Sequence, residues 1–283
     1  MKSQWECIQQ NIGAWHGSFT QFSPDGKQLK DTPSVLTLSE TEPGQTMQLT
    51  LERTPEDSSK DVVTREFSHP GPAPYVYFFE DGSFTQGTSH WASFGQFGVE
   101  MSIKEGDRRD RFVIMYDGTS GGTSQIKYVT LIRETQKGGT QFTEPSLTPE
   151  QLLGQWEGTA EVLHSTMDPM TTGNSHWLLE SNPKLTCKEQ FDDNVQSLVI
   201  DRGDRATLSS DENLVLEGDL TYQLMPLPNG AYCLLPQTIC KDKAFRIEVG
   251  WLRAGDRRSR LIRYYDSRGV WMHSALIKDH LSA

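Results

Sequence analysis

Short segments in which apolar and polar residues alternate recur along the chain. Residues 47–51 and 245–249 alternate strictly, and a period of two predicts strands with one buried and one solvated face. Denser apolar runs at residues 75–79, 112–115 and 214–216 are typical of strands buried on both faces. Asp-Gly and Asn-Gly pairs between such runs favour tight hairpins. The pattern therefore predicts an antiparallel all-β protein.

A duplication organises these strands. Gly106-Asp107-Arg108-Arg109-Asp110-Arg111 returns as Gly255-Asp256-Arg257-Arg258-Ser259-Arg260, and a Gly-x-Trp-x-Gly motif opens both residues 13–17 and residues 154–158. The copies keep their order and are about half a chain apart, which is far longer than the unit of a solenoid. Each copy should therefore be a whole domain.

Short helices are expected where each copy begins. Ser3 with Glu6, and Thr148 with Gln151 around Pro149, follow the pattern of a helix N-terminus. Residues 135–140 are polar and rich in glycine, as linkers are. We expect a first barrel over residues 1–135, a linker over 136–147 and a second barrel over 148–283.

Composition limits the class of partner. The chain has 283 residues and a formal net charge of −11, with a pI of about 5.1. This balance disfavours nucleic acid and anionic lipid as partners. The four cysteines are too few, and too unevenly divided between the copies, for a disulfide framework. With no apolar leader and no apolar run long enough to span a membrane, the sequence predicts a cytoplasmic protein with free thiols.

A short helix followed by Gly-x-Trp at the first strand of a barrel of this length resembles the lipocalin-like (calycin) fold. In that family a basic residue of the last strand stacks over the tryptophan. The resemblance therefore implies that Arg133 stacks on Trp15 and that Lys278 stacks on Trp156. The Thr-Asp-Tyr element of the family is absent from this sequence.

The doubled motif resembles a family of two-domain lipocalin-like proteins of unknown function from cyanobacteria and plastid-bearing organisms. This resemblance implies an all-β fold of two tandem lipocalin-like antiparallel barrels, each opened by a short helix. Related proteins include fatty-acid carriers and the bilin lyases that attach pigments.

Candidate ligand contacts are aromatic residues that could line a barrel and arginines of the repeated hairpins. An arginine on each hairpin could hold a ligand carboxylate, although solvated turn residues are the more economical interpretation. The two Ser-His-Trp triplets place His90 and His176 beside tryptophans, where a histidine can carry a proton. The candidate ligand-binding residues are Trp91, His90, Trp177, Trp251, Tyr265, Arg111 and Arg260.

Standard catalytic and cofactor signals are weak. Gly118-Thr119-Ser120-Gly121-Gly122 matches the letters of a nucleophile elbow, but a strand pattern follows it instead of a helix. Cys233 and Cys240 are too far apart for a typical zinc pair. No glycine-rich phosphate loop occurs. We expect no catalytic residues of these types, no cofactor and no metal.

Three functions remain open. The first is non-catalytic binding or carriage of a small lipophilic or pigment-like ligand in one of the barrels. The second is a bilin-lyase-like or isomerase-like enzyme, with His90 or His176 as proton carrier. The third is an interaction module with filled barrels, in which residues 54–74 and 164–176 bind another protein.

Overall fold

The computed structural model describes residues 2–56, 59–166, 170–181, 185–191, 198–200, 214–216 and 220–282. Two compact units divide the chain. The first comprises Met1–Gly87, Gly98–Met115 and Lys127–Phe142, and the second comprises Thr88–Phe97, Tyr116–Ile126 and Thr143–Ala283. The second unit thus includes two segments of the first repeat, which the duplication did not predict.

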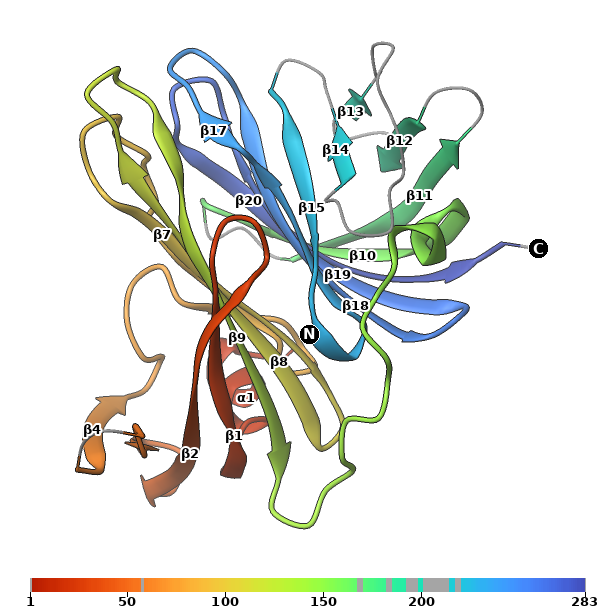
Figure 1. Ribbon diagram of the computed structural model, residues 1–283. Helices are drawn as coiled ribbons and strands as arrows, with labels where there is room; N and C mark the ends of the chain where they lie inside the picture. Colours follow the sequence, from red (N-terminus) through yellow and green to blue (C-terminus); the bar gives the residue numbers. More distant parts are fainter. Residues whose placement is uncertain are drawn as a thin grey trace. The chain divides into compact units, whose positions relative to one another are not determined.

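The first repeat begins with helix α1 (Gln4–Gln9), whose first turn is closed by Ser3 and Glu6. The Ser3 amide donates to the Glu6 carboxylate at 2.7 Å, and the Glu6 amide donates to Ser3 Oγ at 3.2 Å. Antiparallel strands follow in the order β4-β3-β2-β1-β9-β8-β7-β6-β5 (Figure 1). Their bounds are β1 Gly13–Phe22, β2 Gln28–Glu42, β3 Thr46–Arg53, β4 Asp61–Ser68, β5 Tyr77–Phe78, β6 Phe84–Gly87, β7 Phe97–Glu105, β8 Arg108–Gly118 and β9 Ser124–Gln136.

The second repeat begins with a 3₁₀ turn, η1 (Pro149–Leu152), and a further 3₁₀ turn, η2, spans Pro228–Gly230. Its sheet has the order β13-β12-β11-β10-β20-β19-β18-β16-β15-β14, and β17 pairs with the start of β9 inside the second unit. The strand bounds are β10 Gly154–His164, β11 Thr171–Ser181, β12 Leu185–Phe191, β13 Leu198–Ile200, β14 Leu214–Leu216, β15 Tyr222–Pro226, β16 Ala231–Pro236, β17 Thr238–Ile239, β18 Phe245–Ala254, β19 Arg257–Tyr265 and β20 Trp271–Leu281.

The two sheets repeat the same connections. The first strand of each copy pairs with the second strand and also with the last one, as β1 does with β2 and β9, and β10 with β11 and β20. Each Gly-Asp-Arg-Arg motif lies at a hairpin, β7–β8 or β18–β19. The mostly-β class predicted from the sequence is confirmed. The first sheet curls into a half-barrel, and β4 and β5 at its two ends are not paired with one another.

Close backbone approach explains the second glycine of each Gly-x-Trp-x-Gly motif. A Cβ at Gly17 would lie 1.9 Å from the carbonyl oxygen of Arg133, and a Cβ at Gly158 would lie 2.1 Å from that of Lys278. Both contacts cross from the first strand of a copy to its last strand. Only glycine allows the strands to meet this closely.

The tryptophan of each motif ties the preceding helical turn to the strand. Trp15 Nε1 donates to the carbonyl of Asn11 at 2.8 Å, and Trp156 Nε1 donates to the carbonyl of Leu152 at 3.1 Å. Both indoles are fully buried. Satisfying the polar atom makes this burial favourable.

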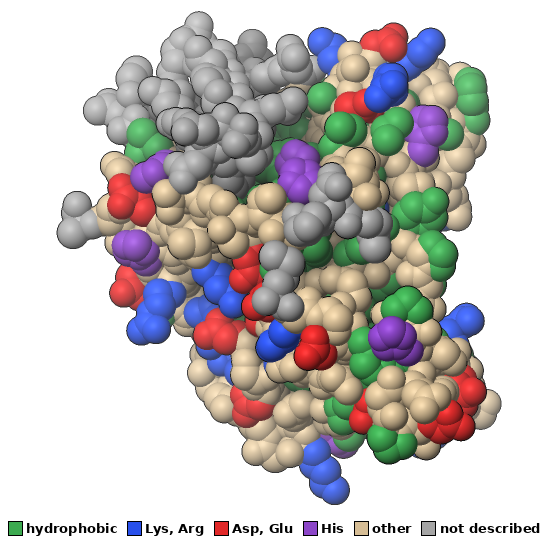
Figure 2. All heavy atoms as spheres, turned by 180° about the vertical axis from the view of Figure 1, so that it is seen from behind, with side chains coloured by type: hydrophobic (Ala, Val, Ile, Leu, Met, Phe, Trp, Pro, Cys, Tyr) green, Lys and Arg blue, Asp and Glu red, His purple; other side chains and the backbone are tan. Residues whose placement is uncertain are grey.

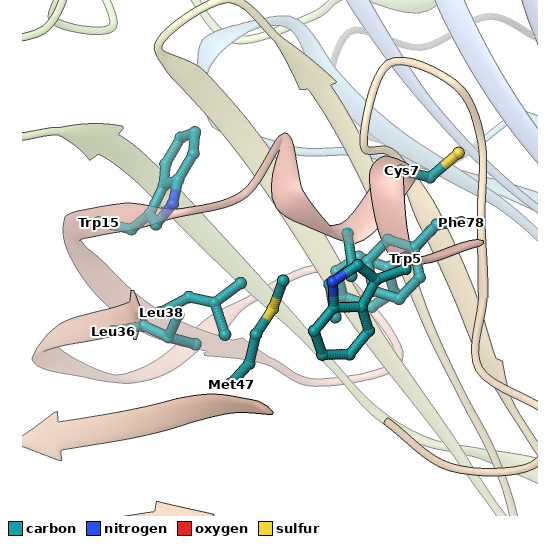
Figure 3. Close-up of a cluster of buried hydrophobic side chains, with 9 residues drawn as sticks. Trp5, Cys7, Trp15, Leu36, Leu38, Met47 and Phe78 are labelled. Atoms are coloured by element: carbon teal, nitrogen blue, oxygen red, sulfur yellow. The ribbon is translucent and has the colours of Figure 1, made fainter. Parts of the chain in front are cut away.

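A hydrophobic cluster packs α1 against the first sheet. Figure 3 shows Trp5 of α1 close to Phe78 of β5, with Leu38 and Met47 directed from β2 and β3 toward the same region. Trp5 also meets Phe67 edge-on, with ring centroids 6.3 Å apart. The short helix is therefore held mainly by tertiary packing, as expected for a helix of six residues.

The second unit has an aromatic cluster of its own. Phe245 stacks on Tyr265 with ring centroids 4.6 Å apart, and Phe97 meets both rings edge-on. Trp91 packs against Phe245 at 6.5 Å. Segment 88–97 therefore belongs to the hydrophobic packing of the second unit.

The alternation in residues 245–249 correctly predicts a strand, but its prediction that one face of this strand is exposed to solvent is wrong. Arg246 and Glu248, which the pattern places on a solvated face, are 1% and 0% exposed. They form an ion pair at 3.0 Å. Both faces of this strand are therefore buried, and one of them carries charge.

Candidate functional site

A cavity of about 690 Å³ lies inside the first unit. Leucines of β2 and β3 form an apolar side of the cavity. Polar residues of β6, β7 and β8 form a polar side. Segment 69–76, which connects β4 to β5, also contributes side chains. The apolar lining consists of Ile8, Leu36, Leu38, Leu49, Leu51, Phe67, Pro72, Ala73, Val76, Phe78 and Phe84, and the polar lining of Asn11, Thr64, Arg65, Glu66, Gln86, Glu100, Arg109 and Arg111.

Hydrogen bonds join polar side chains of β6–β9 and Asn11, which lies between α1 and β1, into a continuous network. We call this network the polar belt; its members are Gln86, Glu100, Arg111, Glu134, Arg109 and Asn11. At one end Gln86 Nε2 donates to Glu100 at 2.6 Å, and Arg111 Nη1 donates to the other oxygen of the same carboxylate at 2.8 Å. At the other end Arg109 Nη1 donates to Asn11 Oδ1 at 2.9 Å. The arginines are thereby fixed in one arrangement.

Glu134 occupies the centre of the polar belt. It is fully buried and accepts from Arg109 Nε at 2.8 Å and from Arg111 Nε and Nη2 at 2.9 and 3.0 Å. Burial alone would raise the pKa of Glu134, but the charges of Arg109 and Arg111 outweigh burial and lower the pKa below its ordinary value. The carboxylate is therefore ionised at neutral pH.

The two arginines of the belt differ in their surroundings. Burial lowers the pKa of Arg109, although the charge of Glu134 opposes the shift. For Arg111 the charges of Glu134 and Glu100 overcome burial, so the pKa rises above its ordinary value. Both guanidiniums stay protonated. Arg111 thus contacts two carboxylates, Glu134 and Glu100, whereas the only carboxylate of the belt that Arg109 contacts is Glu134.

The second unit repeats this arrangement around Asp279. Arg258 donates to both oxygens of Asp279, at 3.0 and 2.7 Å, and Arg260 Nε donates to Asp279 at 3.0 Å. Arg258 also lies 4.2 Å from the ring centroids of both Trp156 and Trp177. Its guanidinium is enclosed by two indoles, whereas the equivalent Arg109 lines the cavity.

Two of the candidate ligand residues are buried arginines of these clusters. Arg111 lines the cavity of the first unit. Arg260 bonds to Asp279 and donates to Ser175 Oγ at 3.2 Å. Trp177 lies beside it, with its ring centroid 5.7 Å from the Arg260 guanidinium. The interpretation of these arginines as solvated turn residues is wrong for both.

The other aromatic candidates lie in the second unit and are not part of the cavity lining. Trp91 donates to Ser124 Oγ at 2.9 Å, and Trp251 lies 4.6 Å from the guanidinium of Arg253. Tyr265 accepts from Arg263 and donates to the carbonyl of Thr88 at 2.8 Å. Burial raises the pKa of Tyr265 to about 12, so its hydroxyl remains a donor at neutral pH.

The histidines expected to carry protons are on the surface. His90 is exposed, and its Nε2 lies 3.1 Å from the carbonyl oxygen of Arg268. The His176 side chain is 53% exposed and lies 3.9 Å from Glu157. Neither lines the cavity of the first unit, whereas Glu66 and Glu100 do. The structure therefore does not bring either histidine, the proton carriers named in the isomerase hypothesis, to this cavity.

The stacking partners inferred from the lipocalin resemblance are corrected by the structure. Arg109 lies over Trp15 at 4.3 Å. Arg133 pairs with Ser18, three residues from Trp15, so the two side chains leave the sheet on opposite faces. In the second copy Lys278 pairs with Thr159 and is exposed, whereas Arg258 takes the place over Trp156.

Several belt residues were not predicted from the sequence. Glu134 and Asp279 follow Arg133 and Lys278 directly, so each last strand carries a basic residue next to an acidic one. That shared pair was the available signal. Residues 129–132 of β9 are all buried, so buried and exposed positions do not alternate along this strand. Alternation therefore does not indicate which member of the basic–acidic pair faces inward.

The remaining motifs have structural roles. Residues 119–123 form the turn between β8 and β9, with Thr119 and Thr123 joined by a backbone hydrogen bond of 2.7 Å. Within the described ranges no group of His, Cys, Asp and Glu is arranged to hold a metal ion. Cys7, Cys233 and Cys240 are free thiols, while the side chain of Cys187 lies outside the described residues.

Surface charge is mixed. Lysine and arginine are interspersed with aspartate and glutamate over the face shown in Figure 2. Among the described residues no helix is long and apolar enough to cross a membrane.

Comparison with known proteins identifies the family. A crystal structure of a protein of unknown function from Nostoc punctiforme, of the DUF3598 family, matches with a TM-score of 0.87 and 31% identity over 100% of both chains. The chain belongs to the DUF3598 family. Residues 1–139 match the model of the N-terminal DUF3598 domain, a domain of unknown function.

The second half of this DUF3598 protein has a further likeness. Residues 143–282 match the C-terminal domain model of the biogenesis factor required for ATP synthase 1. A search among curated proteins found no match.

Proposed function

We propose that the first unit binds a small lipophilic molecule inside a lipocalin-like half-barrel and carries it without chemical change. The cavity of about 690 Å³ supports this proposal, because pockets for small molecules commonly measure about 300–1,000 Å³ and are mainly apolar. Leu49 and Leu51 are only partly buried by protein atoms. A ligand would remove their remaining surface from water.

A cavity-filling variant tests the proposal. Native mass spectrometry with absorbance on the full chain, purified from a photosynthetic host, should reveal a bound lipophilic mass or pigment. Leu49→Trp places an indole in the cavity and should abolish that adduct. Val62→Trp is the matched control, because Val62 is 52% exposed and does not line the cavity. Apo masses for the wild type and both variants would contradict carriage.

A second candidate function rests on the family match of residues 143–282. By that likeness the second unit acts as an assembly factor that binds a subunit of ATP synthase. Purified ATP synthase subunits should then bind the full chain, and Leu49→Trp should bind them equally well. Loss of binding in that variant would tie the interaction to the cavity instead.

A further inference from the structure

We infer that the ligand of the first unit carries no net charge at neutral pH and meets the polar belt through hydrogen-bonding groups. This inference rests on the proposed function and specifies its ligand. It departs from the hypothesis that the hairpin arginines hold a ligand carboxylate. The geometry of the polar belt decides between the two.

The pair of Arg111 donors that could bind a ligand carboxylate in a bidentate way is already bound to Glu134. Arg111 Nε and Nη2 donate to the two oxygens of Glu134, at 2.9 and 3.0 Å. This is the paired geometry by which guanidinium recognises carboxylates. Arg109 is held in a similar way, by Glu134 and Asn11. An acidic ligand would have to displace a buried internal carboxylate.

Charge is also balanced around the cavity. The guanidiniums of Arg109 and Arg111 face the carboxylates of Glu134 and Glu100, with contacts of 2.7–2.9 Å. Arg65 and Glu66, neighbours on β4, add one charge of each sign to the lining. A charged ligand would therefore bring an uncompensated charge into a partly buried site, which is costly.

Hydrogen-bonding capacity nevertheless remains in the belt. The amide oxygen of Gln86 is an acceptor on the cavity lining, and each guanidinium has more N–H groups than the bonds above use. A hydroxyl, carbonyl or amide of a neutral ligand can use these groups without breaking an internal ion pair. The leucines of β2 and β3 can cover its apolar part.

Two dyes that share one apolar skeleton test the inference on the wild-type full chain. N-phenyl-1-naphthylamine is neutral, and 8-anilinonaphthalene-1-sulfonate adds one sulfonate to that skeleton. Fluorescence titration should show the neutral dye binding at least about tenfold more tightly, and Leu49→Trp should abolish its binding. Equal or tighter binding of the sulfonate, also lost in Leu49→Trp, would overturn the inference and leave carriage standing. Binding of neither dye would overturn both.

A charge variant sharpens the test. Glu100→Gln removes one carboxylate from the lining and leaves an excess positive charge, so the sulfonate should bind about tenfold more tightly than to the wild type. The readout is the affinity of the sulfonate relative to that of the neutral dye in the same variant, and this ratio should rise about tenfold. Glu42→Gln makes the same charge change at an exposed position outside the cavity and should alter neither affinity. An unchanged ratio in folded Glu100→Gln would overturn the inference.

Discussion

Arg109 lies over the indole of Trp15, with its guanidinium carbon 4.3 Å from the ring centroid, while its Nε donates to buried Glu134. Arg258 repeats this arrangement over Trp156 at 4.2 Å, with Asp279 as the acid. The duplicated Gly-Asp-Arg-Arg motif therefore supplies the cation for the tryptophan of the Gly-x-Trp motif. In each copy the two repeated motifs thus pack together into one arginine–tryptophan–acid cluster.

Glu134, the acid of this cluster in the first copy, should be the position where substitution lowers stability most. Glu134→Gln leaves two buried guanidiniums without their shared carboxylate, and we expect it to lower the free energy of unfolding by about 3–5 kcal/mol. Urea denaturation followed by tryptophan fluorescence measures the change. Asp61→Asn is the control, because it breaks an ion pair with Arg53 whose side chains are 38% and 44% exposed, and it should cost about 0–1 kcal/mol. A loss below about 1 kcal/mol in Glu134→Gln would contradict this role.

The stacked arginine should not tolerate lysine. Arg109→Lys keeps the charge but loses the planar surface over Trp15 and the fork of donors that reaches Glu134 and Asn11. We expect a loss of about 1–3 kcal/mol of unfolding free energy. Arg53→Lys, at a half-exposed site, should change stability by less than about 0.5 kcal/mol. Similar stability of the two variants would show that charge alone matters at position 109.

The sequence predicted the strands, the hairpins and the duplication because these depend on local periodicity and turn residues. It did not predict that Arg109 rather than Arg133 covers Trp15. That choice depends on which face each strand presents, and burial of residues on both faces removes the alternation that would show it. The cavity could not be predicted from local sequence patterns either, because Leu49 and Gln86 line it together only through the pairing of strands that are distant in the sequence.

The second glycine of the Gly-x-Trp-x-Gly motif should be intolerant of any side chain. Gly158→Ala would place a methyl 2.1 Å from the carbonyl oxygen of Lys278, so β10 and β20 would have to separate. We expect a loss of about 2–4 kcal/mol, measured by thermal or urea unfolding. A Cβ at Gly255 meets nothing within 4 Å, so Gly255→Ala should be within about 1 kcal/mol of wild type. Equal costs at the two positions would contradict the close-approach explanation.

His273 should make stability depend on pH. Burial, with a smaller contribution from the positive charge of nearby His164, lowers the pKa of His273 to about 4, and its ring stacks on Tyr264 at 4.4 Å. The unfolded chain, with a histidine pKa of about 6.5, therefore binds the proton more readily than the folded protein. The stabilising effect of this neutral histidine is complete above about pH 6.5 and is lost as pH falls toward 4.

The wild type should accordingly lose about 1–3 kcal/mol more than His273→Asn between pH 7 and pH 4.5. The comparison requires urea unfolding of both proteins at each pH. The quantity to compare is the difference in unfolding free energy between the two proteins at each pH, because the contribution of the acidic residues is the same in both and cancels. His90→Asn, at an exposed histidine, is the control and should follow the wild-type profile. Parallel profiles for the wild type and His273→Asn would show that His273 is protonated in the folded state as readily as in the unfolded chain.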